Sequence, residues 1–203
     1  MNAGWNEKAL CNWRGEEFTY CDLATQIEKF HLFFDAIGVK KGDKIAICAT
    51  NSARWAITFL AVNTYEAVIV PLLSEFTPDA VANLTHHSES IILFTDKEMW
   101  KRIDSSKVPG LRAVIAVSDF SILMAEKDVE EAYNSVESVF AAKYPDGLKP
   151  ENIHYNTDNW KNLAVINYTS GTTSAPKGVM LRYESHSASI DFATRNIPAT
   201  FAA

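Results

Sequence analysis

The run LAVINYTSGTTSAPKGVML at residues 163–181 determines which fold this sequence predicts. Two apolar segments, Leu163 to Ile166 and Val179 to Leu181, are typical of buried strands. Between them lie several hydroxyl side chains, two glycines and a lysine. Hydroxyls and backbone N–H groups bind phosphate oxygens, glycine lets the backbone approach them, and lysine adds positive charge. The run therefore predicts a phosphate-binding loop between two strands.

The general P-loop motif, G-x-x-x-x-G-K-[ST], does not fit this loop. Counted from Gly171, Pro176 takes the position of the second glycine. Gly178 follows the lysine, where that motif has a Ser or Thr that binds magnesium. The chain also contains no G-x-G-x-x-G turn. These departures argue against a P-loop NTPase and against a dinucleotide-binding dehydrogenase.

Residues 168–179 instead resemble the phosphate-binding motif of the adenylate-forming superfamily, [YF]-T-S-G-[ST]-T-G-x-P-K-G-V. This superfamily includes acyl-CoA synthetases, luciferases and the adenylation domains of peptide synthetases. The chain departs from the motif at Ser174, where the family has glycine, and serine is less suited than glycine to positive φ. A second departure follows Leu181, where RYES at residues 182–185 replaces the family's x-His-x-Asn.

Three upstream stretches resemble family elements in the family's order. FTYCDL at residues 18–23 is similar to T-Y-x-[ED]-L. GDKIAI at 42–47, followed by NSARW at 51–55, is similar to the G-D-x-V-x-I … N-S-x-x-W stretch of fatty acyl-CoA ligases. LAVNTYEAVIVPL at 60–72 is similar to L-A-x-x-x-A-G-A-V-x-V-P-L. Together with the loop, they make the chain resemble the N-terminal part of a long-chain fatty acid–CoA ligase.

The resemblance implies an ATP-dependent ligase that converts a carboxylic acid, expected to be a fatty acid, into an acyl-adenylate and then an acyl-CoA thioester. The implied cofactors and co-substrates are ATP, Mg²⁺ and coenzyme A. Open alternatives are a peptide-synthetase-type or aryl-acid adenylation domain, a non-catalytic nucleotide-binding module, and a flavodoxin-like regulatory domain. The residues implied to bind the ATP phosphates are Thr169, Ser170, Gly171, Thr172, Thr173, Ser174, Lys177 and Gly178.

Length and composition set limits on this interpretation. The chain has 203 residues, far fewer than complete adenylate-forming enzymes, so we expect it to be part of a longer protein. The family's C-terminal catalytic lysine is then expected outside this chain. A net charge of -6 without a dense basic run argues against a nucleic-acid partner. No apolar run approaches membrane-spanning length. The sequence leaves the oligomeric state open.

The cysteines and the paired histidines have ordinary structural explanations. The three cysteines lack metal-type spacing and indicate a reducing compartment, so we expect a cytoplasmic protein, with peripheral membrane association as an alternative. Cys48, in an apolar strand, is expected to be a small buried side chain. His86 and His87 are adjacent, unlike the i, i+4 pair of a zinc site, and we assign them to a helix C-terminus.

The order of elements predicts an α/β fold, with a parallel sheet flanked by helices, as in a partial N-terminal domain of the acetyl-CoA synthetase-like fold. Three regions are expected: an α/β subdomain with an N-terminal hairpin and helix at residues 1–143, a connector at 144–162, and a strand, phosphate-binding loop and helix at 163–203. The expected strands span residues 44–49, 68–72, 91–95, 113–117, 163–166 and 179–181. The expected helices begin after Thr19 and Thr77 and span residues 54–65, 129–143 and 185–196, and a further short helix follows residue 95.

Overall fold

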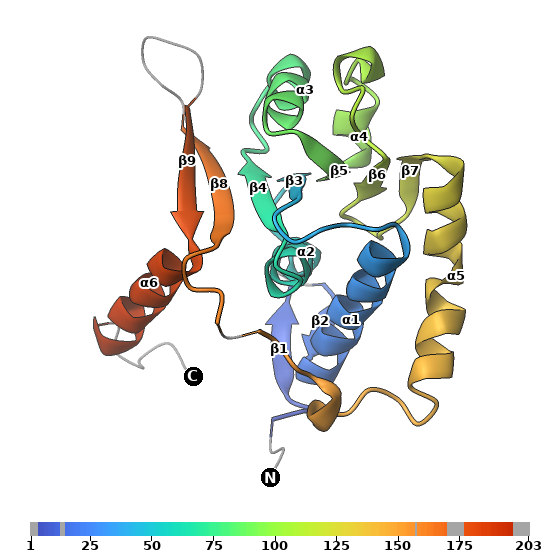
Figure 1. Cartoon of the computed structure of the whole chain (residues 1–203), viewed down its shortest axis with the longest axis vertical. Helices are drawn as coiled ribbons and strands as arrows, with labels where there is room; N and C mark the ends of the chain where they lie inside the picture. The colour runs from blue at the N-terminus through green and yellow to red at the C-terminus, as the bar shows by residue number, and fades with distance from the viewer. Residues whose placement is uncertain (1–3, 13–14, 157, 170–176, 197–203) are drawn as a thin grey trace.

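The computed structural model describes residues 4–12, 15–156, 158–169 and 177–196. Seven of the strands in these residues form one sheet (Figure 1). Its strands in spatial order are β7, β6, β5, β3, β4, β8 and β9. Their bounds are β3 (Lys44–Cys48), β4 (Val68–Leu72), β5 (Ser90–Thr95), β6 (Ala113–Ala116), β7 (Ile122–Ala125), β8 (Leu163–Thr169) and β9 (Lys177–Arg182). A separate antiparallel hairpin joins β1 (Lys8–Cys11) to β2 (Glu17–Thr19).

Helices cover both faces of the central strands of this sheet. The helices are α1 (Tyr20–Ala36), α2 (Ala53–Thr64), α3 (Pro78–His87), α4 (Lys97–Trp100), α5 (Lys127–Lys143) and α6 (Tyr183–Asn196), with short 3₁₀ turns at Ser105–Lys107 and Pro150–Asn152. Alternate residues of β3 point to opposite faces, so Ile45 and Ile47 join the cluster formed with α1, α2 and α5. Ala46 and Cys48 join the cluster formed with α3 and α4. Because both faces are covered, the strand is apolar from Ile45 to Cys48.

The inner strands β6, β5, β3, β4 and β8 are parallel, as the sequence predicts, and both edge strands are antiparallel. At one edge, β7 pairs antiparallel with β6, and the sequence interpretation had no strand there. A tight turn with a left-handed residue, Phe120 at φ 58°, reverses the chain within a few residues. At the other edge, β9 runs antiparallel to β8, so the predicted phosphate loop connects the two strands of a hairpin.

The N-terminal hairpin and the start of α1 follow the sequence pattern closely. Asn12 N–H donates to Glu16 C=O at 2.9 Å, which closes the hairpin. Thr19 is the N-cap of α1: its hydroxyl accepts from Asp22 N–H at 3.1 Å, and its own N–H donates to the Asp22 carboxylate at 2.9 Å. This reciprocal pair satisfies two backbone donors at the helix end. The backbone N–H of Thr19 holds the pKa of the Asp22 carboxyl below its ordinary value.

The chain returns from α5 to β8 through residues 144–162. In this segment Asn156 is hydrogen-bonded to Glu66 of the sheet body. Glu66 lies between α2 and β4 with a left-handed φ of 67°, and only 7% of it is exposed. Its carboxylate accepts a hydrogen bond of 3.0 Å from Asn156 Nδ2 and forms an ion pair with Lys41. Burial raises the pKa of Glu66, but the bonds from Lys41 and Asn156 outweigh burial and leave it below its ordinary value. The segment after β9 is tied by Tyr183, whose hydroxyl donates to Asn63 C=O at 2.6 Å.

Helices α5 and α6 each begin two residues before their predicted starts. In the part of the chain that the structure describes, every helix falls short of the length and hydropathy needed to cross a membrane.

Replacing Asp22 with Ala should lower the free energy of unfolding by about 1 kcal/mol at pH 7, because the capping box of α1 loses one half. The folded-state pKa of Asp22 is depressed, so its contribution is present above the unfolded pKa of about 3.9 and is lost as pH falls through the folded value. The difference from wild type, measured by urea unfolding, should therefore shrink below about pH 4. Asp146, which is exposed, provides the control: Asp146→Ala should change stability little. An equal loss in both variants would contradict the assigned cap.

Candidate functional site

Strands β3, β4 and β8 are parallel, so their carboxyl ends lie on the same side of the sheet, which we call the carboxyl edge. Open α/β sheets bind ligands outside the carboxyl ends of their strands. A cavity of about 300 Å³ lies there. Polar groups from separate segments converge on it, among them Asn51 before α2, Glu75 after β4, and Asn167 two residues before the end of β8. The full lining is Ala49, Thr50, Asn51, Trp55, Pro71, Leu72, Leu73, Ser74, Glu75 and Asn167.

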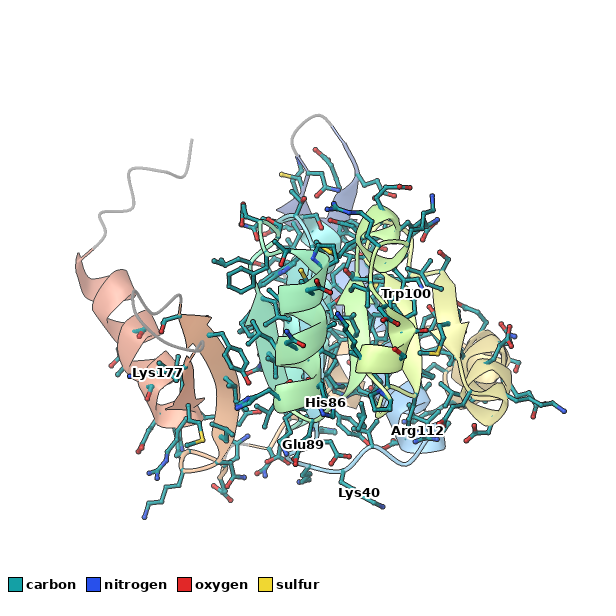
Figure 2. The ribbon with its side chains drawn as sticks, turned by 90° about the horizontal axis from the view of Figure 1, so that it is seen from above. Lys40, His86, Glu89, Trp100, Arg112 and Lys177 are labelled. Atoms are coloured by element: carbon teal, nitrogen blue, oxygen red, sulfur yellow. The ribbon has the colours of Figure 1, made fainter. Side chains whose placement is uncertain are left out.

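The β8–β9 hairpin carries the predicted phosphate-binding residues next to this edge. Cross-strand pairing sets Tyr168 opposite Gly178 and Thr169 opposite Lys177. Thr169 and Lys177 are both exposed. Among the described residues, Lys177 has no ion-pair partner, and Figure 2 shows it on the hairpin, apart from the labelled charges of the sheet body. The hairpin thus presents a hydroxyl and an available cation at the two ends of one connection.

The structure brings together three of the eight predicted site residues: Thr169, Lys177 and Gly178. The other five, Ser170, Gly171, Thr172, Thr173 and Ser174, lie outside the described residues. Their predicted contacts with phosphate therefore remain predictions.

Gly178 permits a close approach that a side chain would block. A Cβ at this position would lie 3.0 Å from Ile166 Cγ2 and 3.3 Å from Tyr168 Cε1. The Tyr168 ring is 5% exposed and packs in the cluster of apolar residues beneath α3. Glycine in β9 therefore lets the strand lie directly against the tyrosine that precedes the loop, in addition to any role beside a phosphate.

The sequence interpretation missed a contact between α3 and the hairpin. His87 Nδ1 and the Tyr168 hydroxyl lie 2.7 Å apart, and the two rings meet edge to face with centroids 5.8 Å apart. Burial raises the pKa of the Tyr168 hydroxyl, so this group stays protonated near neutral pH. His87 was assigned only to the end of a helix, and no local pattern links it to a residue 81 positions away.

Other candidate chemistry at this edge is weak. Burial raises the pKa of the Cys48 thiol to about 12, so it is neither a thiolate nucleophile nor a metal ligand at neutral pH. The described residues contain no group of three His, Cys, Asp or Glu side chains that could hold a metal ion. Mg²⁺ that accompanies a nucleotide is bound largely through phosphate oxygens and water, so it does not require such a group.

A larger cavity, of about 510 Å³, lies at a different place among the described residues. It is lined by apolar side chains of α1 and α2, by Trp5 and by the 150–155 segment. In Figure 1, α1 lies in the lower half of the picture, whereas the ends of β8 and β9 nearest the loop lie near the top. This cavity lacks charged side chains, so it is not the candidate phosphate site.

Fold and site together define an α/β protein whose β8–β9 hairpin sets Thr169 and Lys177 of the predicted phosphate motif opposite each other. The sequence profile of the AMP-binding enzymes matches residues 2–201. The chain belongs to this family of adenylate-forming enzymes.

Two relatives illustrate the range of the match. A probable chloroplastic acyl-activating enzyme 16 of Arabidopsis thaliana is 30% identical over 176 residues, which cover 82% of this chain and 24% of that protein. Long-chain-fatty-acid–CoA ligase 1 of Cavia porcellus is 30% identical over 146 residues, or 69% of this chain and 20% of that protein. The chain thus spans about a quarter or less of the length of these two relatives.

Solved structures confirm the predicted fold. The anthranilate CoA ligase AuaEII in complex with anthranoyl-AMP superposes with a TM-score of 0.76 at 16% identity, over 97% of this chain and 35% of that one. ATP-bound MatB from Rhodopseudomonas palustris superposes with a TM-score of 0.69 at 20% identity, over 93% and 34% of the two chains.

Replacing Gly178 with Ala should lower the free energy of unfolding by about 1–2 kcal/mol, because the new methyl group is overpacked against Ile166 and Tyr168. Gly110 is the matched control, since a Cβ there meets no heavy atom within 4 Å. Gly110→Ala should leave stability unchanged or slightly raised. Urea unfolding of both variants measures the difference. Equal stability of the two variants would contradict the close approach of β9 to Tyr168.

Proposed function

We propose that this chain provides the ATP phosphate-binding part of a ligase that activates a carboxylic acid as an acyl-adenylate and then transfers the acyl group to the thiol of coenzyme A. The observation that carries the proposal is the pairing of Thr169 with Lys177 in a hairpin whose two strands are joined by the sequence SGTTSAP at residues 170–176. Membership of the AMP-binding family supports the nucleotide.

The chemistry explains why such a loop is useful. A carboxylate is a poor acyl donor because its leaving group would be oxide. Transfer of AMP from ATP gives a mixed anhydride and releases pyrophosphate, on which negative charge builds in the transition state. Donors and cations held in place before the reaction stabilise that charge better than water does.

In this proposal each residue has a defined part. The hydroxyls and N–H groups of Thr169, Ser170, Thr172 and Thr173 bind the β- and γ-phosphates. Gly171 permits close approach of the backbone, Ser174 replaces the family's glycine within the same loop, and Gly178 lets β9 lie against β8. Lys177 neutralises charge on the departing pyrophosphate, and Mg²⁺ bound to the nucleotide would add to that neutralisation.

The proposed carboxylate is a fatty acid. The similarity to the Cavia porcellus long-chain-fatty-acid–CoA ligase 1 and the NSARW stretch at residues 51–55 support this substrate. An aryl acid is the second candidate, because the anthranilate ligase has the same fold. Three free cysteines, Cys11, Cys21 and Cys48, support a reducing compartment such as the cytoplasm. Peripheral membrane association is the alternative location.

Replacing Lys177 with Ala should weaken binding of inorganic pyrophosphate and of MgATP about tenfold, since an unpaired cation at the phosphates is lost. Isothermal titration calorimetry with the 203-residue chain measures this. Lys161→Ala is the control, because it removes the same charge from the segment just before β8. Equal affinity of wild type and Lys177→Ala would contradict the phosphate role, as would equal loss in both variants.

The 203-residue chain should catalyse no carboxylate-dependent ATP–pyrophosphate exchange, because it spans 24% of a relative such as acyl-activating enzyme 16. A longer protein that contains this chain should catalyse exchange with its cognate acid, identified by screening fatty and aryl acids with and without coenzyme A. In that protein Lys177→Ala should lower the adenylation rate about 100-fold while the affinity for the acid changes little. Robust exchange by the short chain, or equal losses in rate and acid affinity, would contradict this assignment.

A further inference from the structure

Strand β8 packs along β4, which attaches the β8–β9 hairpin to the sheet body. Six residue pairs hold β8 against β9, and the register between β8 and β4 pairs Val165 with Ile69. That pair lies four residues before Thr169. Contacts beyond that pair therefore also bear on the position of the last residues of β8, next to the loop.

One such contact is made by Tyr168, the residue next to Thr169. Its ring is buried under α3, and its hydroxyl lies 2.7 Å from Nδ1 of His87 at the end of that helix. The hydrogen bond is partly buried, and it favours the position of the ring in which it forms. The edge-to-face packing of the two rings restricts that position further.

The ring in turn determines where β9 lies. Gly178 packs against Tyr168 so closely that a Cβ would stand 3.3 Å from Cε1. Lys177 is the next residue along β9 and pairs with Thr169. Thr169 follows Tyr168 in the chain, and Lys177 precedes Gly178, which packs against the ring. A shift of the Tyr168 ring would therefore move Thr169 and Lys177 together.

We propose that His87 is a positioning residue for the phosphate site: through its hydrogen bond to Tyr168 it sets the placement of Thr169 and Lys177. The identity of the bound phosphates rests on the proposed function above, whereas the placement itself does not. Because His87 is exposed, its bond contributes modestly to global stability, and its main effect is on the geometry of the hairpin end.

The chain offers matched controls for this proposal. His86, the neighbouring exposed histidine, is not bonded to the hairpin among the described contacts, so His86→Ala removes an imidazole without touching Tyr168. Tyr183→Phe removes a different tyrosine hydrogen bond, from the Tyr183 hydroxyl to Asn63 C=O. Tyr183 follows the last residue of β9, at the end of the hairpin that is far from the loop. This variant tests whether loss of any hydrogen bond between the hairpin region and the sheet body weakens phosphate binding.

The test uses four variants of the 203-residue chain: His87→Ala, Tyr168→Phe, their combination, and His87→Asn, whose amide lies near the position of Nδ1. Titration with inorganic pyrophosphate should give affinities about fivefold weaker for each single variant, a similar value for the double variant, and recovery towards wild type for His87→Asn. His86→Ala and Tyr183→Phe should bind as wild type does. Additive losses in the double variant, or an equal loss in Tyr183→Phe, would overturn the proposal.

Amide hydrogen exchange provides a readout that does not depend on the ligand. His87→Ala and Tyr168→Phe should both speed exchange in Thr169, Lys177 and Gly178 more than in Met180 and Leu181, which lie further from the loop. If wild type fails to bind pyrophosphate but this pattern is seen, the phosphate assignment fails and the positioning role stands. Unchanged exchange at the hairpin end would overturn the positioning role even if wild type binds pyrophosphate.

Discussion

Six residue pairs hold β8 against β9 and bring a threonine and a lysine opposite each other, with a polar run of residues between them. This pairing is the constraint on which the candidate site depends. A phosphate loop that starts and ends on paired strands has its two ends fixed at the spacing of an antiparallel ladder. The loop sequence then determines which donors point inward, but the distance between Thr169 and Lys177 is a property of the sheet.

The sheet that carries this hairpin has two parts with different constraints. Strands β3, β4, β5 and β6 are buried on both faces, and residues such as Ile45, Ile69 and Phe94 have no exposed surface. Close packing of this kind leaves little room for displacement. The hairpin is an edge element instead, with 45% of Val179 and 70% of Met180 exposed. Its position comes from the packing of β8 along β4 and from separate polar contacts, at Glu66, Tyr183 and His87, that tie the returning chain to the body.

Local sequence signals predicted the elements well and their long-range partners poorly. Thr19 with Asp22, and Thr77 with Pro78, marked helix starts because capping involves residues three positions apart or less. The antiparallel strand β7 was missed, since its residues are half-buried and few in number. The contact between His87 and Tyr168 was also missed, because it joins α3 to a strand 81 residues later and depends on β8 lying beside β4. At the site, the motif predicted Thr169, Lys177 and Gly178 together, and cross-strand pairing accounts for their proximity.

The described residues at the carboxyl ends of the strands indicate what chemistry they can supply. A protein nucleophile would need an activated thiol or hydroxyl, yet the pKa of the Cys48 thiol is raised to about 12 by burial. His87, the histidine bonded to the hairpin, has its Nδ1 engaged with a tyrosine hydroxyl rather than with a serine. What the described residues do offer is an available cation on β9 and, in the lining of the cavity, the amides of Asn51 and Asn167 with the carboxylate of Glu75. Cations and amides of this kind stabilise negative charge that develops on a bound substrate. The proposed formation of an acyl-adenylate draws on them in this way, because ATP itself supplies the leaving group, pyrophosphate.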